Sequence, residues 1–262
     1  MDFTLQTYKN LLLAFKQNKY KFITVKQFFS KNISDKKIVI MRHDIDRLPE
    51  NALHTAKLES ALDLKATYYF RTLPVSFNEK IIRKINELGH EIGYHYENMD
   101  VCKGNIKKAW DNFCTELDKL RRITDIKTIC MHGSPLSKWD NRRLWDKYNY
   151  QDLGIIAEPY FDFNFDKIFY ITDTGRKWDG YKVSIRDKIN TQMQNHKKQT
   201  DRFHKTYEII KAVESNQFAS KVLITTHPER WTNNYLLWLK ELIVQNLKNS
   251  IKYLIVKASN RQ

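Results

Sequence analysis

The chain has 262 residues, of which 42% are hydrophobic and 13% aromatic, enough for a buried core and too apolar for a disordered protein. Seven glycines and five prolines exclude collagen-like and low-complexity architectures. The formal net charge of +15 favours anionic partners in general, but the basic residues are spread along the chain without a nucleic-acid motif, so no nucleic acid partner is predicted.

The cysteines and the apolar segments indicate the cellular setting. The three cysteines, Cys102, Cys114 and Cys130, contain no Cys-x-x-Cys pair, which favours free thiols in a reducing compartment. The N-terminal segment has no cleavage site typical of a leader peptide, and no segment approaches 18 uninterrupted apolar residues. We therefore expect a cytoplasmic protein without membrane insertion.

Helices and strands are predicted to alternate along the first part of the chain. Two short helices at about residues 4–17 and 24–31 precede a strand at 37–44, whose continuous apolar centre is typical of a strand buried on both faces. The patterns that follow predict a helix at 49–62, a strand at 65–70, a helix at 77–88, a strand at 90–95, a helix at 104–122, a strand at 127–132 and a helix at 138–148.

The pattern changes between about residues 149 and 186. Short aromatic strands are predicted around 161–165, 167–171 and 181–185, and we interpret this segment as an elaboration over one mouth of a barrel. A helix at about 203–214, a strand at 221–227 and a helix at about 231–248 follow. The alternation predicts an α/β fold with a parallel sheet, in one domain over residues 1–262 with a core at about 37–230 and N-terminal helices within 1–32.

Polar residues follow four of the predicted strands. The strand ends read His43-Asp44-Ile45-Asp46, His95-Tyr96-Glu97, His132-Gly133-Ser134 and His227-Pro228-Glu229. Active sites of parallel α/β proteins gather at the carboxyl ends of strands, so we expect these residues to form one site.

Asp44 and Asp46 suggest a metal site. They are two residues apart, so both carboxylates project to the same side of an extended chain. Two carboxylates this close repel each other when both are ionised, unless a cation lies beside them. One would then ligate a metal and the other act as general base, although Asp46 alone could also cap the next helix. Histidine and carboxylate ligands without cysteine favour Zn²⁺ or another divalent first-row metal.

The same segments resemble a known family. RHDID, LKATYYF, INELGHEIGYH, ICMHGSP and VLITTHP, in this order over about residues 37–230, are similar to the successive blocks of the polysaccharide deacetylases, metal-dependent carbohydrate esterases that include chitooligosaccharide and peptidoglycan deacetylases. The resemblance implies a distorted (β/α) barrel of about seven strands, here with an N-terminal helical extension. It also implies hydrolysis of an N-acetyl group on an amino sugar.

The resemblance further implies roles for individual residues. Asp44 corresponds to the general base, Asp46 and His95 to metal ligands, and His227 to the general acid. The segment from Asp173 through Arg176 to Trp178 is similar to the block that supplies an aspartate and a tryptophan to the substrate pocket.

Two positions depart from the family pattern. Met99 stands where the second metal histidine is expected, so His132, which we favour, or Glu97 would have to replace it. The segment around Met131–Pro135 lacks the arginine that orients the general base in the family. Arg42 or Arg176 would have to orient Asp44 instead.

The sequence therefore predicts a metal-dependent deacetylase, with zinc as the first choice of cofactor, that cleaves a carbon–nitrogen bond in an amino-sugar substrate. A phosphate linkage in that substrate is one option, given the positive charge. The alternative is a metal-free barrel of the same kind that binds a glycan or a nucleotide sugar.

Overall fold

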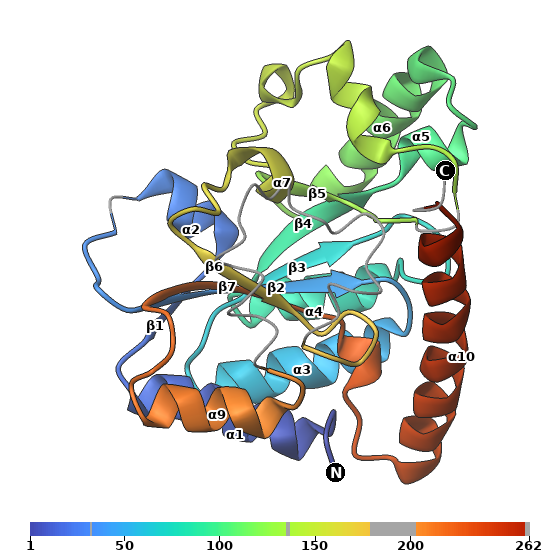
Figure 1. Cartoon of the computed structure of the whole chain (residues 1–262). Helices are drawn as coiled ribbons and strands as arrows, with labels where there is room; N and C mark the ends of the chain where they lie inside the picture. The colour runs from blue at the N-terminus through green and yellow to red at the C-terminus, as the bar shows by residue number, and fades with distance from the viewer. Residues whose placement is uncertain (32, 135–136, 179–202, 260–262) are drawn as a thin grey trace.

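A curled parallel sheet forms the centre of the protein, as Figure 1 shows for the computed structural model. The structure describes residues 1–31, 33–134, 137–178 and 203–259, with 251–259 described by their backbone alone. The strands are β1 (Lys21–Ile23), β2 (Ile38–Ile45), β3 (Thr67–Phe70), β4 (Glu91–Tyr96), β5 (Ile129–Met131), β6 (Phe169–Thr172) and β7 (Lys221–Thr226). Their order is β5-β4-β3-β2-β7-β6, and β1 pairs with the first half of β2. The predicted α/β fold, a barrel-like parallel sheet of about seven strands, is confirmed, and the sheet is curled into a half-barrel.

Side chains alternate between two cores along each strand. On β2, Ile38 and Ile40 belong to the apolar cluster inside the curl of the sheet, whereas Val39 and Met41 pack with the helices outside. All eight residues of β2 are buried, as expected for a central strand covered on both faces. Continued along the strand, the same alternation directs Arg42 and Asp44 inward and His43 outward.

Helices surround the sheet, most of them on its outer face. These are α1 (Leu5–Gln17), α2 (Val25–Ser30), α3 (Pro49–Ala61), α4 (Glu79–Glu87), α5 (Asn98–Val101), α6 (Ile106–Arg121), α7 (Pro159–Asp162), α9 (Thr206–Glu214) and α10 (Tyr235–Ser259). Helices α2 and α7 pack against the inner core instead. Helix α1 begins where Thr4 accepts a hydrogen bond from the Thr7 amide, and α3 begins with Pro49 in its first turn, as expected. Among the described helices, none combines the length and the apolar composition needed to cross a bilayer.

Three predicted elements differ in the structure. The segment 161–165 is not a strand, because Glu158 caps the short helix α7, which begins at Pro159. The segment 138–148 forms a short 3-10 helix, η1 (Asn141–Asp146). The strand predicted around 167–171 exists as β6, but it pairs with β7 at the edge of the sheet, so this part of the segment belongs to the sheet and is not a cover over the barrel mouth. The strand predicted at 181–185 lies outside the described residues.

Candidate functional site

Four strands bring the predicted site residues to one edge of the sheet. Asp44 lies near the end of β2, His95 on β4, and His132 and His227 directly follow β5 and β7. Each side chain faces inward because the strand alternation that buries the inner core continues to the strand ends. The parallel strands therefore place these groups together, although they are far apart in the sequence.

Asp46, His95 and His132 form a group with the geometry of a metal site. Their ligand atoms all lie within 4.8 Å of one another. Asp46 Oδ1 is 3.5 Å from His95 Nε2 and 3.5 Å from His132 Nε2. Donors bound at about 2.0 Å to a tetrahedral zinc ion lie about 3.3 Å apart, close to these distances.

The electrostatic surroundings of Asp46 also fit a cation. Its Oδ1 atom is buried and has no hydrogen-bond partner among the described residues. A buried carboxylate oxygen without a partner is costly, and a bound cation would compensate that cost. Burial alone raises the pKa of Asp46, but the His132 and His95 imidazoles outweigh burial and hold that pKa well below its ordinary value. The residues present therefore fit a divalent metal ion.

Hydrogen bonds on the far side of each imidazole direct its free nitrogen toward Asp46. His95 Nδ1 lies 2.9 Å from the Cys130 carbonyl oxygen, which can only accept, so Nδ1 donates there and Nε2 is the nitrogen that faces Asp46. His132 Nδ1 lies 3.0 Å from Ser134 Oγ and 3.3 Å from Glu97 Oε2, and the carboxylate favours a proton on Nδ1. Such partners commonly fix the orientation of metal-binding histidines.

The Glu97 carboxylate pairs with Arg71 and does not belong to the ligand group around Asp46. Arg71 donates to both of its oxygens, Nε to Oε1 and Nη2 to Oε2, each at 2.7 Å. Glu97 therefore connects Arg71 to His132, and of the two replacements considered for the third ligand the geometry supports His132. Met99, at the position of the missing histidine, is buried in the hydrophobic core.

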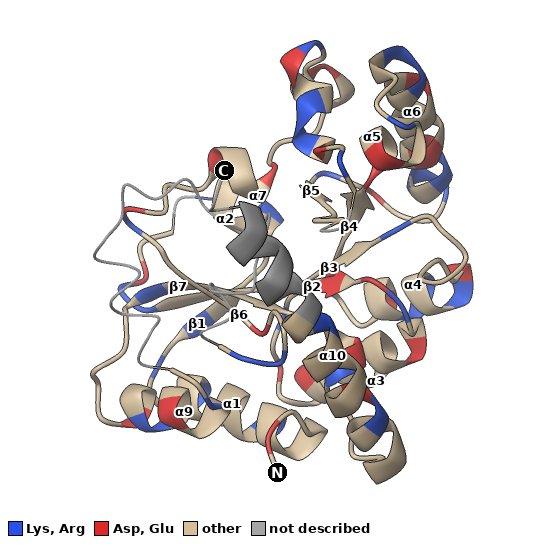
Figure 2. Cartoon of the chain, turned by 45° about the vertical axis from the view of Figure 1, so that its right-hand side comes forward, with Lys and Arg blue, Asp and Glu red and all other residues tan. Residues whose placement is uncertain are grey.

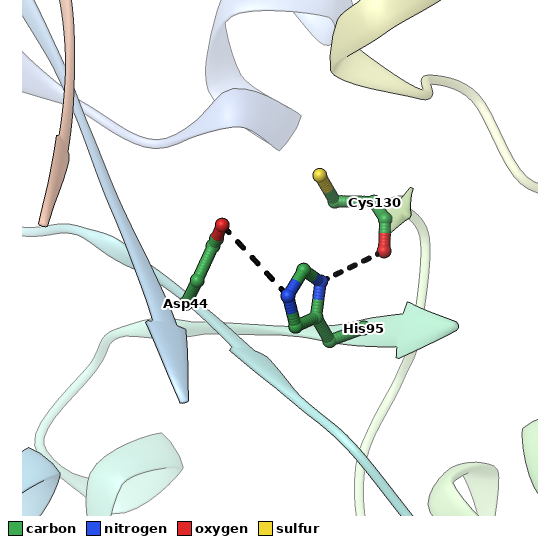
Figure 3. A group of neighbouring side chains, drawn as sticks. All are labelled: Asp44, His95 and Cys130. Carbon is green, nitrogen blue, oxygen red and sulfur yellow. Dashed lines mark hydrogen bonds and ion pairs between the residues drawn. The ribbon is translucent and has the colours of Figure 1, made fainter. Parts of the chain in front are cut away.

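A second group of potential ligands shares His95. Asp44, His95 and Cys130 also offer ligand atoms within 4.8 Å of one another (Figure 3). The Asp44 carboxylate, however, already accepts from Arg42 Nε at 2.8 Å and from Arg42 Nη2 at 2.6 Å. Because that guanidinium neutralises Asp44, and His95 Nε2 can serve one group at a time, the group with the unpartnered Asp46 is the better metal site.

Arg42 holds Asp44 in place. The arginine lies two residues earlier on β2, and its guanidinium packs over the rings of Tyr69 and Tyr160. Burial raises the pKa of Asp44, but the charges of Arg42 and His95 outweigh burial and lower it below its ordinary value. Asp44 is therefore ionised at neutral pH and oriented by a bidentate pair.

His227 is held by a buried carboxylate. Its Nδ1 atom lies 2.6 Å from Asp173 Oδ1, and Asp173 also accepts from Arg230 Nη1 at 2.8 Å and from the Trp231 indole at 2.7 Å. Burial and the Arg230 charge lower the pKa of His227, but Asp173 outweighs them and raises it to about 9. The imidazole is thus protonated at neutral pH.

The other predicted substrate-binding residues, Arg176 and Trp178, both contact aromatic side chains. Trp178 is only 2% exposed, packs against Phe3 and Trp231, and donates from its indole to Thr206 Oγ1. The Arg176 guanidinium lies over the Phe3 and Trp238 rings. Trp178 is therefore part of the aromatic core, whereas Arg176 Nε and Nη2 are buried without a hydrogen-bond partner among the described residues, and contact of Arg176 with a substrate stays a prediction.

Two site residues were missed in the sequence. Arg71, which holds Glu97, directly follows the strand that ends at Phe70. Arg230, which contacts Asp173, follows β7 in the same turn as His227. A search of all strand ends for arginine, in addition to histidine and acids, would have found Arg71.

No family model matches the chain, and no curated protein matches it. Solved structures of family 4 carbohydrate esterases (CE4), the class that the sequence blocks resemble, do match. A CE4 pseudoenzyme from Bacillus anthracis shares 12% identity, with 84% of this chain and 63% of that chain covered and a TM-score of 0.47. A family 4 carbohydrate esterase from Bacillus anthracis shares 9% identity, with 92% and 86% covered and a TM-score of 0.44.

The CE4 domain of a multidomain xylanase from the hindgut metagenome of Trinervitermes trinervoides also matches. It shares 12% identity, with 82% of this chain and 85% of that chain covered and a TM-score of 0.45. The chain spans less than two thirds of the length of the pseudoenzyme, at 63%.

Proposed function

We propose that this protein is a metal-dependent hydrolase that cleaves the amide bond of an N-acetylated amino sugar. The observation that carries the proposal is that ligand atoms of Asp46, His95 and His132 converge. The Asp44 carboxylate, oriented by Arg42, lies beside His95, and the charge of the His227 imidazole acts on Asp46. These three residues would hold a divalent ion, with zinc as the first choice. Such an ion supplies a Lewis acid that polarises the acyl carbonyl and acidifies a nearby water molecule.

Asp44 is the proposed general base. It accepts the proton of the attacking water while the water oxygen bonds to the acyl carbon. Arg42 keeps both Asp44 oxygens in place, and each oxygen retains a lone pair for the proton.

His227 is the proposed general acid. Its Nε2 proton passes to the amide nitrogen while the carbon–nitrogen bond breaks, so the products are a carboxylate and an amino sugar. Asp173 fixes the proton on Nδ1 and keeps the ring charged until that transfer.

The test is release of acetate from chitooligosaccharides by the purified full chain. We expect turnover that a chelator abolishes and that added zinc restores. If the protein binds the sugar but releases no acetate at any zinc concentration, the proposal is wrong and the metal-free binding module becomes the better description.

A further inference from the structure

A polar stripe runs along the inner side of α10, beside half-buried Trp238 and Leu242. Glu241, Gln245 and Asn249 are buried, and their spacing of four residues places them in one stripe along the helix. Glu241 forms an ion pair with Arg47, and Asn249 donates to the Gly175 carbonyl oxygen at 2.9 Å. The helix is therefore attached to the rest of the protein through these polar contacts and through Trp238, whose ring packs on Arg176 and whose indole donates to the Asp2 carbonyl oxygen.

The outer side of α10 is apolar. Leu236, Ile243 and Leu247 are 75%, 53% and 63% exposed. At 100° per residue these positions lie on one face, opposite the polar stripe, with exposed Lys240 between them. A surface helix normally shows the reverse arrangement. Single exposed apolar residues are common, but several on one face of a helix indicate an interaction surface.

We propose that this outer stripe of α10, formed by Leu236, Ile243 and Leu247, docks the protein onto an anionic lipid surface. The charges of the helix are complementary to such a surface. The sequence of α10 contains four lysines and one glutamate, and that glutamate, Glu241, is turned inward onto Arg47. The whole chain carries a net charge of +15, with Lys and Arg spread over many elements (Figure 2).

Lys240 favours lipid over a second copy of the chain. Pairing two α10 helices through this stripe would bury Lys240 among leucines, and the described outer face of α10 offers no acid to pair with it. Two copies that each carry +15 would also repel each other. At a bilayer, the lysine stem lies along apolar surface while its ammonium group reaches the lipid phosphates.

The docked helix would bring the candidate site close to the lipid headgroups. On its inner side α10 contacts Arg47, which follows Asp46, and Gly175, which lies two residues after Asp173. A helix is about 10–12 Å across, so the loops of the site would lie about that far from the surface. The binding mode is interfacial and needs no spanning helix.

The experiment is sedimentation of the full chain with vesicles, either of phosphatidylcholine alone or of phosphatidylcholine with an equal part of phosphatidylglycerol. We expect binding to the anionic vesicles only, weakening as salt is raised. Combining Leu236→Asn, Ile243→Asn and Leu247→Asn should reduce the affinity about a hundredfold or more, because each buried aliphatic side chain contributes roughly tenfold. The substituted residues are exposed, so thermal unfolding should be unchanged.

The matched control combines Val75→Asn, Val101→Asn and Ile156→Asn, three aliphatic residues that are also exposed but lie elsewhere. This variant should bind vesicles as the natural chain does. Equal binding by both triple variants, equal binding to both vesicle types, or no binding would overturn the proposal. A dimer in light scattering that the α10 variant abolishes, without vesicle binding, would assign the stripe to a second copy. None of these outcomes depends on metal or on turnover, so they are separate from the test of the proposed hydrolase.

Discussion

Asp44 and Asp46 lie on the same side of the chain, and their neighbours give them different chemistry. Arg42 occupies both oxygens of Asp44, whereas Asp46 Oδ1 faces two imidazole nitrogens without a hydrogen bond. The first carboxylate is thereby kept ionised and oriented, and the second is left available for a cation. The two-residue spacing predicted the shared side, and Arg42 on the same strand distinguishes Asp44, whereas the histidines around Asp46 come from other strands.

Substitutions at the third ligand position distinguish His132 from Glu97. His132→Ala should lower zinc affinity by more than about 100-fold, because a ligand is lost. Glu97→Gln should lower it by only about 10- to 100-fold, the effect typical of an outer hydrogen-bond partner. Competition with a zinc chelator measures both affinities. A larger loss for Glu97→Gln than for His132→Ala would identify Glu97 as the ligand.

Substrates with different leaving groups test His227. We expect His227→Ala to reduce kcat/KM for the N-acetyl amide by about 10²- to 10⁴-fold, because the departing nitrogen needs a proton. An activated acetate ester leaves without protonation and should be spared. Asp44→Asn should slow both substrates while zinc remains bound. Equal losses on ester and amide for His227→Ala would show that this residue acts in binding instead.

The pH dependence of kcat/KM follows from the same pair. Asp44 must be deprotonated, and its pKa lies below the ordinary value, so the acid limb should lie well below neutral pH. His227 must be protonated, and its pKa is raised to about 9, so the rate should fall as the pH rises through that value. Asp173→Asn removes the carboxylate that raises this pKa and should move the alkaline limb to lower pH. An alkaline limb that Asp173→Asn leaves in place would contradict the assignment.

At the scale of elements, a buried polar cluster joins α1, α3 and the sheet. Glu59 of α3 accepts from Tyr8 at 2.5 Å, from Tyr68 at 2.6 Å and from His43 Nε2 at 2.8 Å. The second ring nitrogen of His43 pairs with Thr226 on β7 at 2.7 Å. This cluster attaches the N-terminal helix to the outer face of the barrel.

Removing the charge of Glu59 should destabilise the fold. Glu59→Gln leaves buried donors imperfectly paired, and we expect the free energy of unfolding to fall by about 3 kcal/mol. Urea unfolding measures the change. The matched control is Glu79→Gln, which affects an exposed pair with Arg83 and should cost less than about 1 kcal/mol. Similar effects of the two substitutions would contradict the structural role of the cluster.

The sequence predicted the strands that carry the site, because continuous apolar runs and polar strand ends are local signals. It missed β1, whose three residues are too few for a periodic pattern. It also misassigned 161–165, where Phe161 belongs to α7 and is exposed, whereas Phe163 and Phe165, in the chain after α7, fill the inner core. The pairs Arg71–Glu97 and Asp173–His227 join different strands or their ends, so no local pattern could reveal them.

At the scale of the whole molecule, the curled sheet determines where the chemistry lies. The parallel strands bring the polar residues at their carboxyl ends together. Helix α10 contacts the loops beside these strand ends through Arg47 and Gly175. The basic residues behind the net charge of +15 are spread along the sequence without a concentrated block. The proposed role of this charge, attraction to an anionic lipid surface, involves the lysines of α10. The candidate site and the docking surface therefore lie on opposite sides of one helix.

The metal content of the purified chain tests the central claim most directly. Elemental analysis of the natural protein after dialysis against zinc should give about one zinc per chain, and Asp46→Ala and His95→Ala should each give none while circular dichroism shows an intact fold. A natural chain without zinc, or either variant with a full complement of zinc, would contradict the account.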